Sequence, residues 1–493
     1  MPPAEKPKTA CKLEYPVYVR LIVESDPTQA ESLAAQVEGL LRADDGFALY
    51  DFHVTPDASN ATIAFDALRT VQHTDPASPE HKESALTVNV KADSSVKSTE
   101  TTLWSWVPLL EVRHNPGDAE DTATLAVFIS QVIHRIFTEE QNTISYLLEE
   151  TAFTSGRPIK QPSPEIKAEL DAKKTRAFKY ASTYHLTFSL FTSSALPASW
   201  DVEEALESTI QPLINRFSGI SHFTVDTQVQ LYASFSPSIA GPQYDDTSRE
   251  WQLQRSDLSG FINAAEWPLS PGIGAGPTIN FVLFVPSQDQ SPLVIAENGG
   301  NSWLIPQWGG VQILNPAGKQ PDKLTAHHLE PVMLTFADQL STLLGLPSSP
   351  PSLALRIQSL TRERATSIIV SASSTLGALA RLSLKLKSIA IPKSVANSVD
   401  ETLHHLDQAC RALHAGQFHK ALENARTAED EAEEAFFEPS MVGQVYFPDE
   451  HKVAVYVPLL GPMGVPLVMV LVKELRAFIK RLREKKSQKA KDE

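Results

Sequence analysis

Short runs in which apolar and polar residues alternate dominate the first part of the chain, and each run predicts a half-buried strand. The first covers residues 15–24 (YPVYVRLIVE). In the next segment, 26–44, apolar residues recur every three or four positions, which predicts an amphipathic helix capped by Asp26. The residues expected to form its buried stripe are Leu33, Val37, Leu40 and Leu41.

Strands and helices of the same kind alternate up to about residue 350. Further predicted strands are 47–54, 61–65, 85–90, 184–192, 223–235, 278–286 and 293–295. Predicted helices are 121–150 and 200–217, and the polar stretch 245–276 is expected to form surface loops. This order is typical of a mixed α/β body, in which the nearly continuous apolar run 278–286 is expected to be a central strand. Because residues 154–164 have the composition of a linker, the body (14–350) is expected to have two lobes, 14–153 and 165–350.

Beyond Pro351 the pattern becomes wholly helical, and a helical section is expected over residues 351–450. Long helices are predicted at 353–389, 394–415 and 417–437, with Gly416 between the last two. Their seam is expected to consist of Ala412, Leu413, Phe418, Ala421, Leu422 and Ala425. The acidic run 429–434 is expected to be a solvated helix face.

Residues 453–472 (VAVYVPLLGPMGVPLVMVLV) carry no charge and predict a transmembrane helix. A helix of this length covers roughly 30 Å, the thickness of the hydrocarbon core of a bilayer. Pro458, Pro462 and Pro466 recur every four residues, and such prolines are tolerated in a membrane where neighbouring helices satisfy the freed carbonyls. A buried segment of a soluble domain is the alternative. The basic tail, 473–493, favours the membrane because it follows at once, as in a stop-transfer sequence.

Charge is distributed unevenly between this tail and the rest of the chain. The tail has nine Lys/Arg and four Asp/Glu, whereas the net charge of the whole chain is −16. The positive-inside rule therefore predicts a cytosolic tail and a luminal body, with membrane lipid around the span. An acidic body repels phosphate backbones, so nucleic acid is not expected as a partner.

The first 13 residues are expected to form an unstructured leader. They contain no apolar stretch typical of a signal peptide or of a first membrane helix, although a luminal body needs a translocation signal. We therefore expect that a membrane helix of the natural protein is missing upstream of Met1.

No residue pattern along the chain is typical of catalysis. Cys410 has Asp407 three residues before it and His414 four residues after it. On a helix Asp407 and His414 are roughly 10 Å apart, so the carboxylate cannot orient the imidazole as a triad requires. The GxSxG, HExxH and phosphate-loop sequences are absent as well. No catalytic residue is assigned.

Metal and cofactor sites are not expected either. The pairs His327–His328 and His404–His405 each have one carboxylate within helical reach, which is too few ligands for a metal, so solvated histidines are expected. The glycines of the segment 299–310 do not open a helix as dinucleotide sites do, and tight turns are expected there.

Two further features bear on the compartment. Cys11 and Cys410 are the only cysteines. A bridge between them requires an oxidising compartment, and we expect instead that two cysteines in a chain of this length occur by chance. Asn60 lies in the one Asn-x-Ser/Thr sequence of the chain, and it is expected to be a glycosylation site if the body is luminal.

Two segments resemble signature stretches of a known family. They are residues 301–316 (NSWLIPQWGGVQILNP) and residues 436–467, which run directly into the predicted span. Both look like the class S subunit (PIG-S) of the glycosylphosphatidylinositol (GPI) transamidase, and the order of α/β body, helical section, span and short tail is also similar. In one respect the chain departs from the pattern, because members of that family begin with a membrane helix.

The resemblance implies a non-catalytic subunit of an endoplasmic reticulum complex that joins proprotein C-termini to GPI. Its partners would be the other transamidase subunits, including the cysteine-protease-like catalytic one, and this chain would act as a scaffold. Trp303, Trp308 and Tyr446 are expected to be packing or interface anchors, because aromatic residues are common anchors of such contacts. The interface candidates are Trp303, Trp308, Tyr446, Pro458, Pro462 and Pro466.

Two other functions compete with this hypothesis. A cytosolic, tail-anchored adaptor is one, because the helices on either side of Gly416 look like a tetratricopeptide hairpin, although one hairpin is too little for a solenoid. A membrane-bound hydrolase with Cys410 as its first candidate nucleophile is the other.

Overall fold

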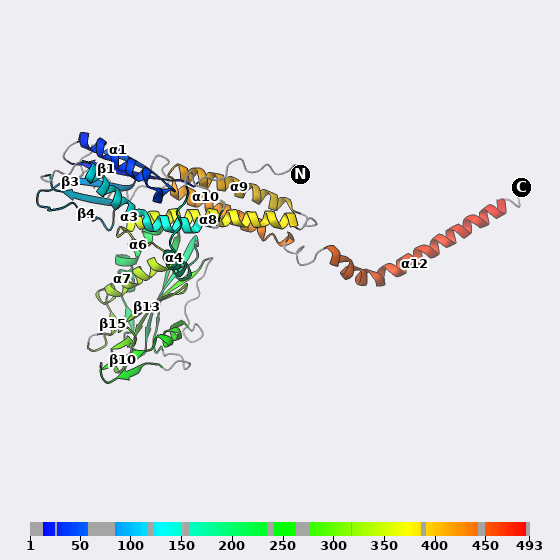
Figure 1. Cartoon of the computed structure of the whole chain (residues 1–493). Coiled ribbons are helices and arrows are strands. Elements are labelled where there is room, and N and C mark those ends of the chain that lie inside the picture. The colour runs from blue at the N-terminus through cyan, green and yellow to red at the C-terminus, as the bar shows by residue number, and fades with distance from the viewer. Residues whose placement is uncertain are drawn as a thin grey trace. The chain divides into compact units, whose positions relative to one another are not determined.

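The computed structural model describes residues 13–24, 27–57, 84–116, 122–149, 151, 158–233, 241–262, 276–316, 318–385, 391–441 and 449–489. The chain divides into two compact units. The larger comprises Met1–Val370 with Leu406–Arg426, and the smaller comprises Ser371–His405 with Thr427–Glu493. Figure 1 shows the chain coloured along its length. Strands occur up to residue 324 and helices follow, so the predicted mixed α/β body with a helical section after it is confirmed.

The first sheet of the larger unit has five strands in the order β2-β1-β3-β5-β4. Neighbours are parallel, except that β4 and β5 are antiparallel. The strands are β1 (Tyr15–Val23), β2 (Tyr50–Asp57), β3 (Ser84–Ala92), β4 (Glu100–Leu103) and β5 (Leu109–His114). The alternating pattern predicts β1, β3 and most of β2 but misses the two shortest strands, β4 and β5. The predicted strand 61–65 lies outside the described residues.

Two predicted helices, α1 (Pro27–Ala43) and α3 (Thr122–Leu148), pack against each other, and α1 also contacts β2. Leu33, Val37 and Leu41 of α1 are buried as expected. Leu40 is 40% exposed, so its expected burial is wrong. The buried stripe is centred on Val37 and Leu41, and Leu40 lies at its margin.

The second sheet of the larger unit has the order β13-β14-β11-β6-β8. Only β13 and β14 are antiparallel. The strands are β6 (Thr183–Thr192), β8 (His222–Gln230), β11 (Thr278–Val285), β13 (Ser302–Ile305) and β14 (Gly309–Ile313). β11 is the middle strand and is buried from Ile279 to Val285, which confirms the central strand expected from its nearly continuous apolar run.

Both faces of this sheet are covered, since alternate residues of β11 enter different core clusters. Phe281 and Leu283 belong to the main cluster, to which the helices α5, η3, α6 and α7 also contribute, and Val282 and Phe284 belong to a second cluster. Those helices are α5 (Val202–Ala205), the π-helical turn η3 (Leu206–Ile210), α6 (Gln211–Phe217) and α7 (Ala326–Leu343). The first three replace the single helix predicted at 200–217.

The second cluster is closed by a small sheet, β12-β10-β9. Its strands are β9 (Gln243–Asp245), β10 (Glu250–Leu253) and β12 (Leu293–Ile295). The expectation that residues 245–276 form only loops is therefore wrong at β10, whose Leu253 is buried. A strand of four residues with a single buried side chain leaves too little alternation to be recognised in the sequence.

A further helix, α4 (Pro164–Arg176), begins where the predicted linker ends. Ser163 accepts a hydrogen bond from the backbone N–H of Ile166 and caps this helix, and Pro164 occupies its first turn. The sequence pattern misses α4 because it is polar on most faces and buries only Leu170.

Four long helices follow, of which the first three lie close to the predicted bounds, whereas the last extends well beyond the predicted span 453–472. They are α8 (Leu353–Lys385), α9 (Lys393–His414), α10 (Phe418–Phe436) and α12 (Asp449–Lys489). Gly416, between α9 and α10, has φ +72°, a conformation that favours glycine. The predicted seam residues Leu413, Phe418 and Leu422 are all buried in the main cluster.

The main core cluster is continuous across the larger unit. It includes Val17 from the first sheet, Leu186 from the second, Ile369 of α8 and Leu422 of α10. The two five-stranded sheets therefore share one hydrophobic core with these helices. The smaller unit has a cluster of its own, centred on Leu379, Val395 and Ala435.

Candidate functional site

A buried ion pair lies in the core of the larger unit. Arg362 of α8 donates from Nε and one terminal nitrogen to the two carboxylate oxygens of Glu140 of α3, at 2.6 and 2.8 Å. The two side chains are 1% and 3% exposed. This bidentate geometry satisfies both carboxylate oxygens of Glu140, which a buried carboxylate requires.

Aromatic rings surround this pair. The guanidinium carbon of Arg362 lies 5.9 Å from the centre of the Phe137 ring and 5.1 Å from that of Phe418, within the range of cation–π attraction. One turn further along α8, Thr366 hydrogen-bonds the Tyr15 hydroxyl of β1 at 2.5 Å. Burial raises the pKa of Tyr15, so the hydroxyl stays protonated. Through these contacts α8 is fixed to α3, to β1 and to α10.

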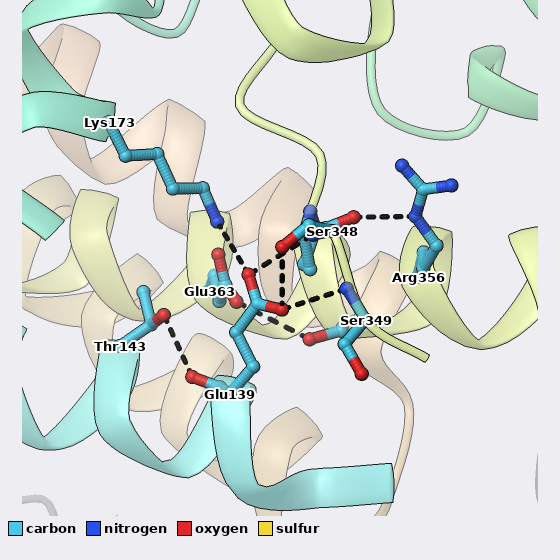
Figure 2. Close-up of polar contacts among 9 residues, drawn as sticks. Glu139, Thr143, Lys173, Ser348, Ser349, Arg356 and Glu363 are labelled. Atoms are coloured by element: carbon cyan, nitrogen blue, oxygen red, sulfur yellow. Dashed lines mark hydrogen bonds and ion pairs between the residues drawn. The ribbon is translucent and has the colours of Figure 1, made fainter. Parts of the chain in front are cut away.

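Next to Glu140, the carboxylate of Glu139 holds the segment between α7 and α8. It accepts hydrogen bonds from the backbone N–H groups of Ser348 and Ser349, at 3.1 and 2.8 Å, and from the Ser348 hydroxyl at 3.2 Å. Lys173 of α4 lies 3.6 Å from the same carboxylate. Figure 2 shows Glu139 at the centre of these contacts, with Arg356 bound to the same segment.

That segment is also tied to the first sheet. The Ser352 hydroxyl donates to the carbonyl of Val107 at 3.0 Å, and the Leu353 N–H donates to the carbonyl of Ser105 at 2.7 Å. Both acceptors lie between β4 and β5. The start of α8 is therefore positioned by α3, by α4 and by the β4–β5 connection together.

Glu363 lies beside this network and is itself buried. Burial raises the pKa of its carboxyl to about 7, and nearby Lys173 opposes that shift. Its oxygen accepts a hydrogen bond from Ser359 at 3.3 Å. A carboxyl that is half protonated near neutral pH needs no full counter-charge in the core.

The cluster has the character of a structural junction. A nucleophilic mechanism needs a Ser, Cys or Thr next to an oriented base, and no histidine takes part in the hydrogen bonds that the structure gives Glu139, Glu140 and Glu363. Its carboxylates accept from backbone N–H groups, hydroxyls and Arg362, contacts that fix the positions of helices. We call it the α3–α8 junction, defined by Glu139, Glu140, Lys173, Ser348, Ser349, Arg362 and Glu363.

Asp407, Cys410 and His414 lie on α9 (Lys393–His414). Asp407 pairs with Arg411 at 2.7 Å along α9 and not with His414. Cys410 is disulfide-bonded, so it is not a free nucleophile, and the expectation that the two cysteines stay unpaired is wrong for Cys410. Cys11, the one other cysteine of the sequence, lies outside the described residues.

The histidine pairs are not joined into a ligand cluster. Exposed His327 lies 3.9 Å from Glu330, and His328 contacts Thr325 as part of the cap of α7. His405 lies 4.0 Å from Glu401. The described residues contain no group of three or more His, Cys, Asp or Glu that would hold a metal ion.

The glycines of residues 299–310 divide into two kinds. Gly299 has φ +63° and lies in a turn, as expected. A turn at residues 306–308 joins β13 to β14, as expected, and Gly309 and Gly310 are the first residues of β14 after it. A Cβ on Gly310 would lie 1.8 Å from the Gln339 side chain, and one on Gly309 would lie 1.8 Å from the Asn280 carbonyl oxygen. These glycines allow close packing of β14 against its neighbours.

The predicted span lies within α12, which continues through Pro458, Pro462 and Pro466. Figure 1 shows this helix curving in its first part. Large apolar side chains are exposed all around it, among them Leu460 at 62%, Met463 at 69% and Leu467 at 69%. An apolar surface of this extent is typical of contact with lipid or with other chains.

A groove of about 620 Å³ runs along one side of α12. It is lined by Tyr456, Val457, Leu460, Gly461, Gly464, Val465, Val468 and Met469. Cβ atoms added to Gly461 and Gly464 would meet no atom within 4 Å. The groove is hollow because these two residues lack side chains, and the three prolines do not line it.

In the described part of the chain, α8 has the length and hydropathy that would allow it to cross a membrane. Its first half is embedded in the core of the larger unit, where Ala365, Ile368 and Ile369 are buried close to Arg362. Of the 18-residue stretch that gives α8 this hydropathy, 22% is buried in the structure.

Of the remaining interface candidates, Trp303 and Trp308 are half-buried and pack against the second core cluster. Packing was one of the two roles expected for them, and an interface role stays a prediction. Tyr446 and the glycosylation candidate Asn60 lie outside the described residues.

Comparison with known proteins identifies the family. The model of the phosphatidylinositol-glycan biosynthesis class S protein (PIG-S) matches residues 4–481, so the chain belongs to that family. The GPI-anchor transamidase component PIGS of Rattus norvegicus is 32% identical over 337 residues, which are 63% of this chain and 60% of the relative.

Two fungal relatives are similarly distant. The GPI transamidase component PIG-S homolog of Schizosaccharomyces pombe is 32% identical over 326 residues, 64% of this chain and 57% of the relative. The GPI transamidase component GPI17 of Saccharomyces cerevisiae is 30% identical over 311 residues, 58% of this chain and 57% of the relative. The matched stretch thus spans about 60% of the length of such relatives.

The buried ion pair gives the first prediction. Arg362→Met leaves Glu140 buried without a counter-charge and should lower the stability of the larger unit by about 3–5 kcal/mol, whereas Glu140→Leu with Arg362→Met should recover most of this loss. Thermal unfolding of the purified chain measures both effects. Arg20→Met is the control, because the Arg20–Asp57 pair at 3.4 Å is partly exposed and contributes at most about 1 kcal/mol. Equal losses for Arg362→Met and Arg20→Met would contradict this account.

The second prediction concerns pH. Because burial raises the pKa of Glu363 from 4.5 to about 7, the folded chain binds this proton more tightly than the unfolded chain, and stability falls as pH rises from 4.5 to 7. Glu363→Gln should match the parent near pH 4 and exceed it by about 3 kcal/mol above pH 7. Denaturation across this pH range tests the difference, with Glu169→Gln on the exposed side of α4 as the control. A constant difference at every pH would refute the assignment.

Proposed function

We propose that this chain is a non-catalytic scaffold subunit of the GPI transamidase of the endoplasmic reticulum, supporting the attachment of GPI to proprotein C-termini. The family match over residues 4–481 carries this proposal. The names of the relatives describe components of a GPI-anchor transamidase, that is, subunits of a complex. The α3–α8 junction supports a non-catalytic role, since its polar groups position helices.

A membrane-anchored, luminal arrangement fits these features. The exposed apolar surface of α12 is suited to a bilayer, and the lysine-rich end of the chain favours a cytosolic tail. The disulfide at Cys410 supports placing the larger unit in an oxidising compartment such as the lumen. Both observations support a luminal body with a cytosolic tail.

The groove on α12 is where we place a helix of a partner subunit. Glycine notches let two helices approach closely in lipid, where packing and not the hydrophobic effect drives association. The three prolines, our candidate face from the sequence, do not line the groove. The proline face and the glycine groove are therefore tested separately.

Membership of the family favours this function over the tail-anchored adaptor. The α9–α10 hairpin, which suggested the adaptor, contributes Leu413, Phe418 and Leu422 to the main core. A hairpin used in this way has no free concave surface of the kind that peptide-binding repeats offer.

Filling the groove tests the helix contact. Gly461→Ile with Gly464→Ile should reduce recovery of the other transamidase subunits with the tagged chain at least fivefold, because the added side chains block close approach. Met463→Ile, outside the groove, should leave recovery unchanged. The triple change of Pro458, Pro462 and Pro466 to Leu tests the proline face. Loss of subunits with the proline variant but not with the glycine variant would move the contact to that face.

Depleting the chain from its own cells tests the proposed function. The surface amount of a GPI-anchored reporter should fall several-fold, while a reporter with an ordinary membrane helix stays constant. Flow cytometry measures both, and the tagged chain should restore the first. An unchanged GPI-anchored reporter after depletion would exclude a role in GPI attachment.

A further inference from the structure

β8 forms one edge of the second sheet and is long for an edge strand. It covers His222–Gln230 and pairs in parallel with β6 along nine consecutive positions. In the described part of the chain no strand pairs with its other side. That side is therefore an open edge about 30 Å long.

The outward-facing backbone groups of β8 follow from its register. The N–H of His222 donates to the carbonyl of Ser182 at 2.8 Å. In a parallel ladder every second residue directs both of its backbone groups to the same neighbour. Residues 222, 224, 226, 228 and 230 therefore face β6, and the N–H and C=O of Val225, Thr227 and Val229 face outward. No hydrogen bond within the described chain satisfies these three residues on that side.

The side chains of β8 divide between two unlike faces. Val225 and Val229 lie on one face with Thr227 between them and are exposed by 37% and 42%, and Leu231, after the end of the strand, is exposed by 38%. Thr224 and Asp226 lie on the other face and are polar. An added strand would continue this division if its own apolar and polar residues alternated, with a basic residue opposite Asp226.

The other long edge of the body is protected. On β2 the outward carbonyl of Phe52 accepts from Arg42 at 3.2 Å, and the outward N–H of Val54 donates to Glu38 at 2.9 Å. Both capping side chains come from α1. Such caps prevent pairing with other chains.

The remaining edges are short. β4 and β13 have four residues each, and the carbonyl of Trp303 in β13 accepts from Gln339 at 3.1 Å. β8 contains no lysine, no arginine and no proline, and Asp226 is its one acidic residue. Among the described edges of the two large sheets, β8 combines length, exposed apolar side chains and unpaired backbone groups.

We infer that β8 is a docking edge for an extended segment of another transamidase subunit, which adds to the second sheet as a further strand. Only an extended chain presents donors and acceptors at the spacing of Val225, Thr227 and Val229. Its apolar residues cover Val225, Val229 and Leu231. This inference rests on the proposed function, because the occupant is a subunit of the same complex.

Hydrogen exchange at single-residue resolution tests strand addition. The full chain is compared alone and in the purified complex. The amides of Val225, Thr227 and Val229 should exchange at least tenfold more slowly in the complex, whereas those of Thr224 and Asp226 should be protected in both. Side-chain packing alone would not produce this alternation. Equal exchange of the outward amides in the two samples, or their protection in the isolated chain as its concentration rises, would overturn the inference, the latter because it indicates a second copy.

A pair of variants distinguishes the contribution of the Thr227 backbone N–H from that of its side chain. Thr227→Pro removes one outward donor without removing a bond to β6 and should lower recovery of at least one subunit several-fold. Thr227→Ala keeps the backbone donor and should leave the recovery of subunits unchanged. Thermal unfolding confirms that both variants fold. Normal recovery with a folded Thr227→Pro chain would count against strand addition, whereas a parent chain that recovers no transamidase subunit at all would instead defeat the proposed function.

Discussion

The attraction between Arg362 and Glu140 is the interaction on which the larger unit most depends. A lone charge in that position would be very unfavourable, because the core around it consists of aromatic and aliphatic side chains. The pair is tolerated only while α3 and α8 keep their positions to within the length of a hydrogen bond. Hydrophobic contacts alone would allow α8 to slide along α3, whereas a bidentate pair permits a single register. Glu139 then extends this constraint to the segment that leads from α7 into α8.

The sequence shows most of the fold but little of this junction. Elements with a long, regular period, such as β1, α3 and β11, are predicted close to their bounds. Strands of four residues and the polar helix α4 are missed, because few of their residues are buried. Glu140 and Arg362 are 222 positions apart, and no local pattern links them. A usable signal does exist, since Glu140 lies at the buried phase of α3, between Phe137 and Ile144. A charge on an apolar stripe implies an opposite charge on another buried stripe.

α12 follows a different physical rule from the rest of the chain. In water its exposed leucines, valines and methionines would be strongly unfavourable, and three prolines would break a solitary helix. In lipid, where the proposed function places this helix, the same side chains are in their preferred solvent, and neighbouring helices can satisfy the carbonyls that the prolines leave free. The contact of α12 with a particular neighbouring helix then depends on the shape of its surface. Gly461 and Gly464 form a notch that lipid chains fill poorly and a neighbouring helix fills well.

The α/β body also has an exposed surface, the open edge of β8. Two side chains of α1 cap β2, and β4 and β13 are short. The open edge of β8 is therefore an exception among the described edges of the two large sheets. An edge strand with exposed valines promotes aggregation in a protein that stays alone. It is harmless when another chain covers it soon after folding. The exposed backbone of β8 and the glycine notch of α12 therefore have the same explanation in our proposal, in that each surface is completed by another subunit.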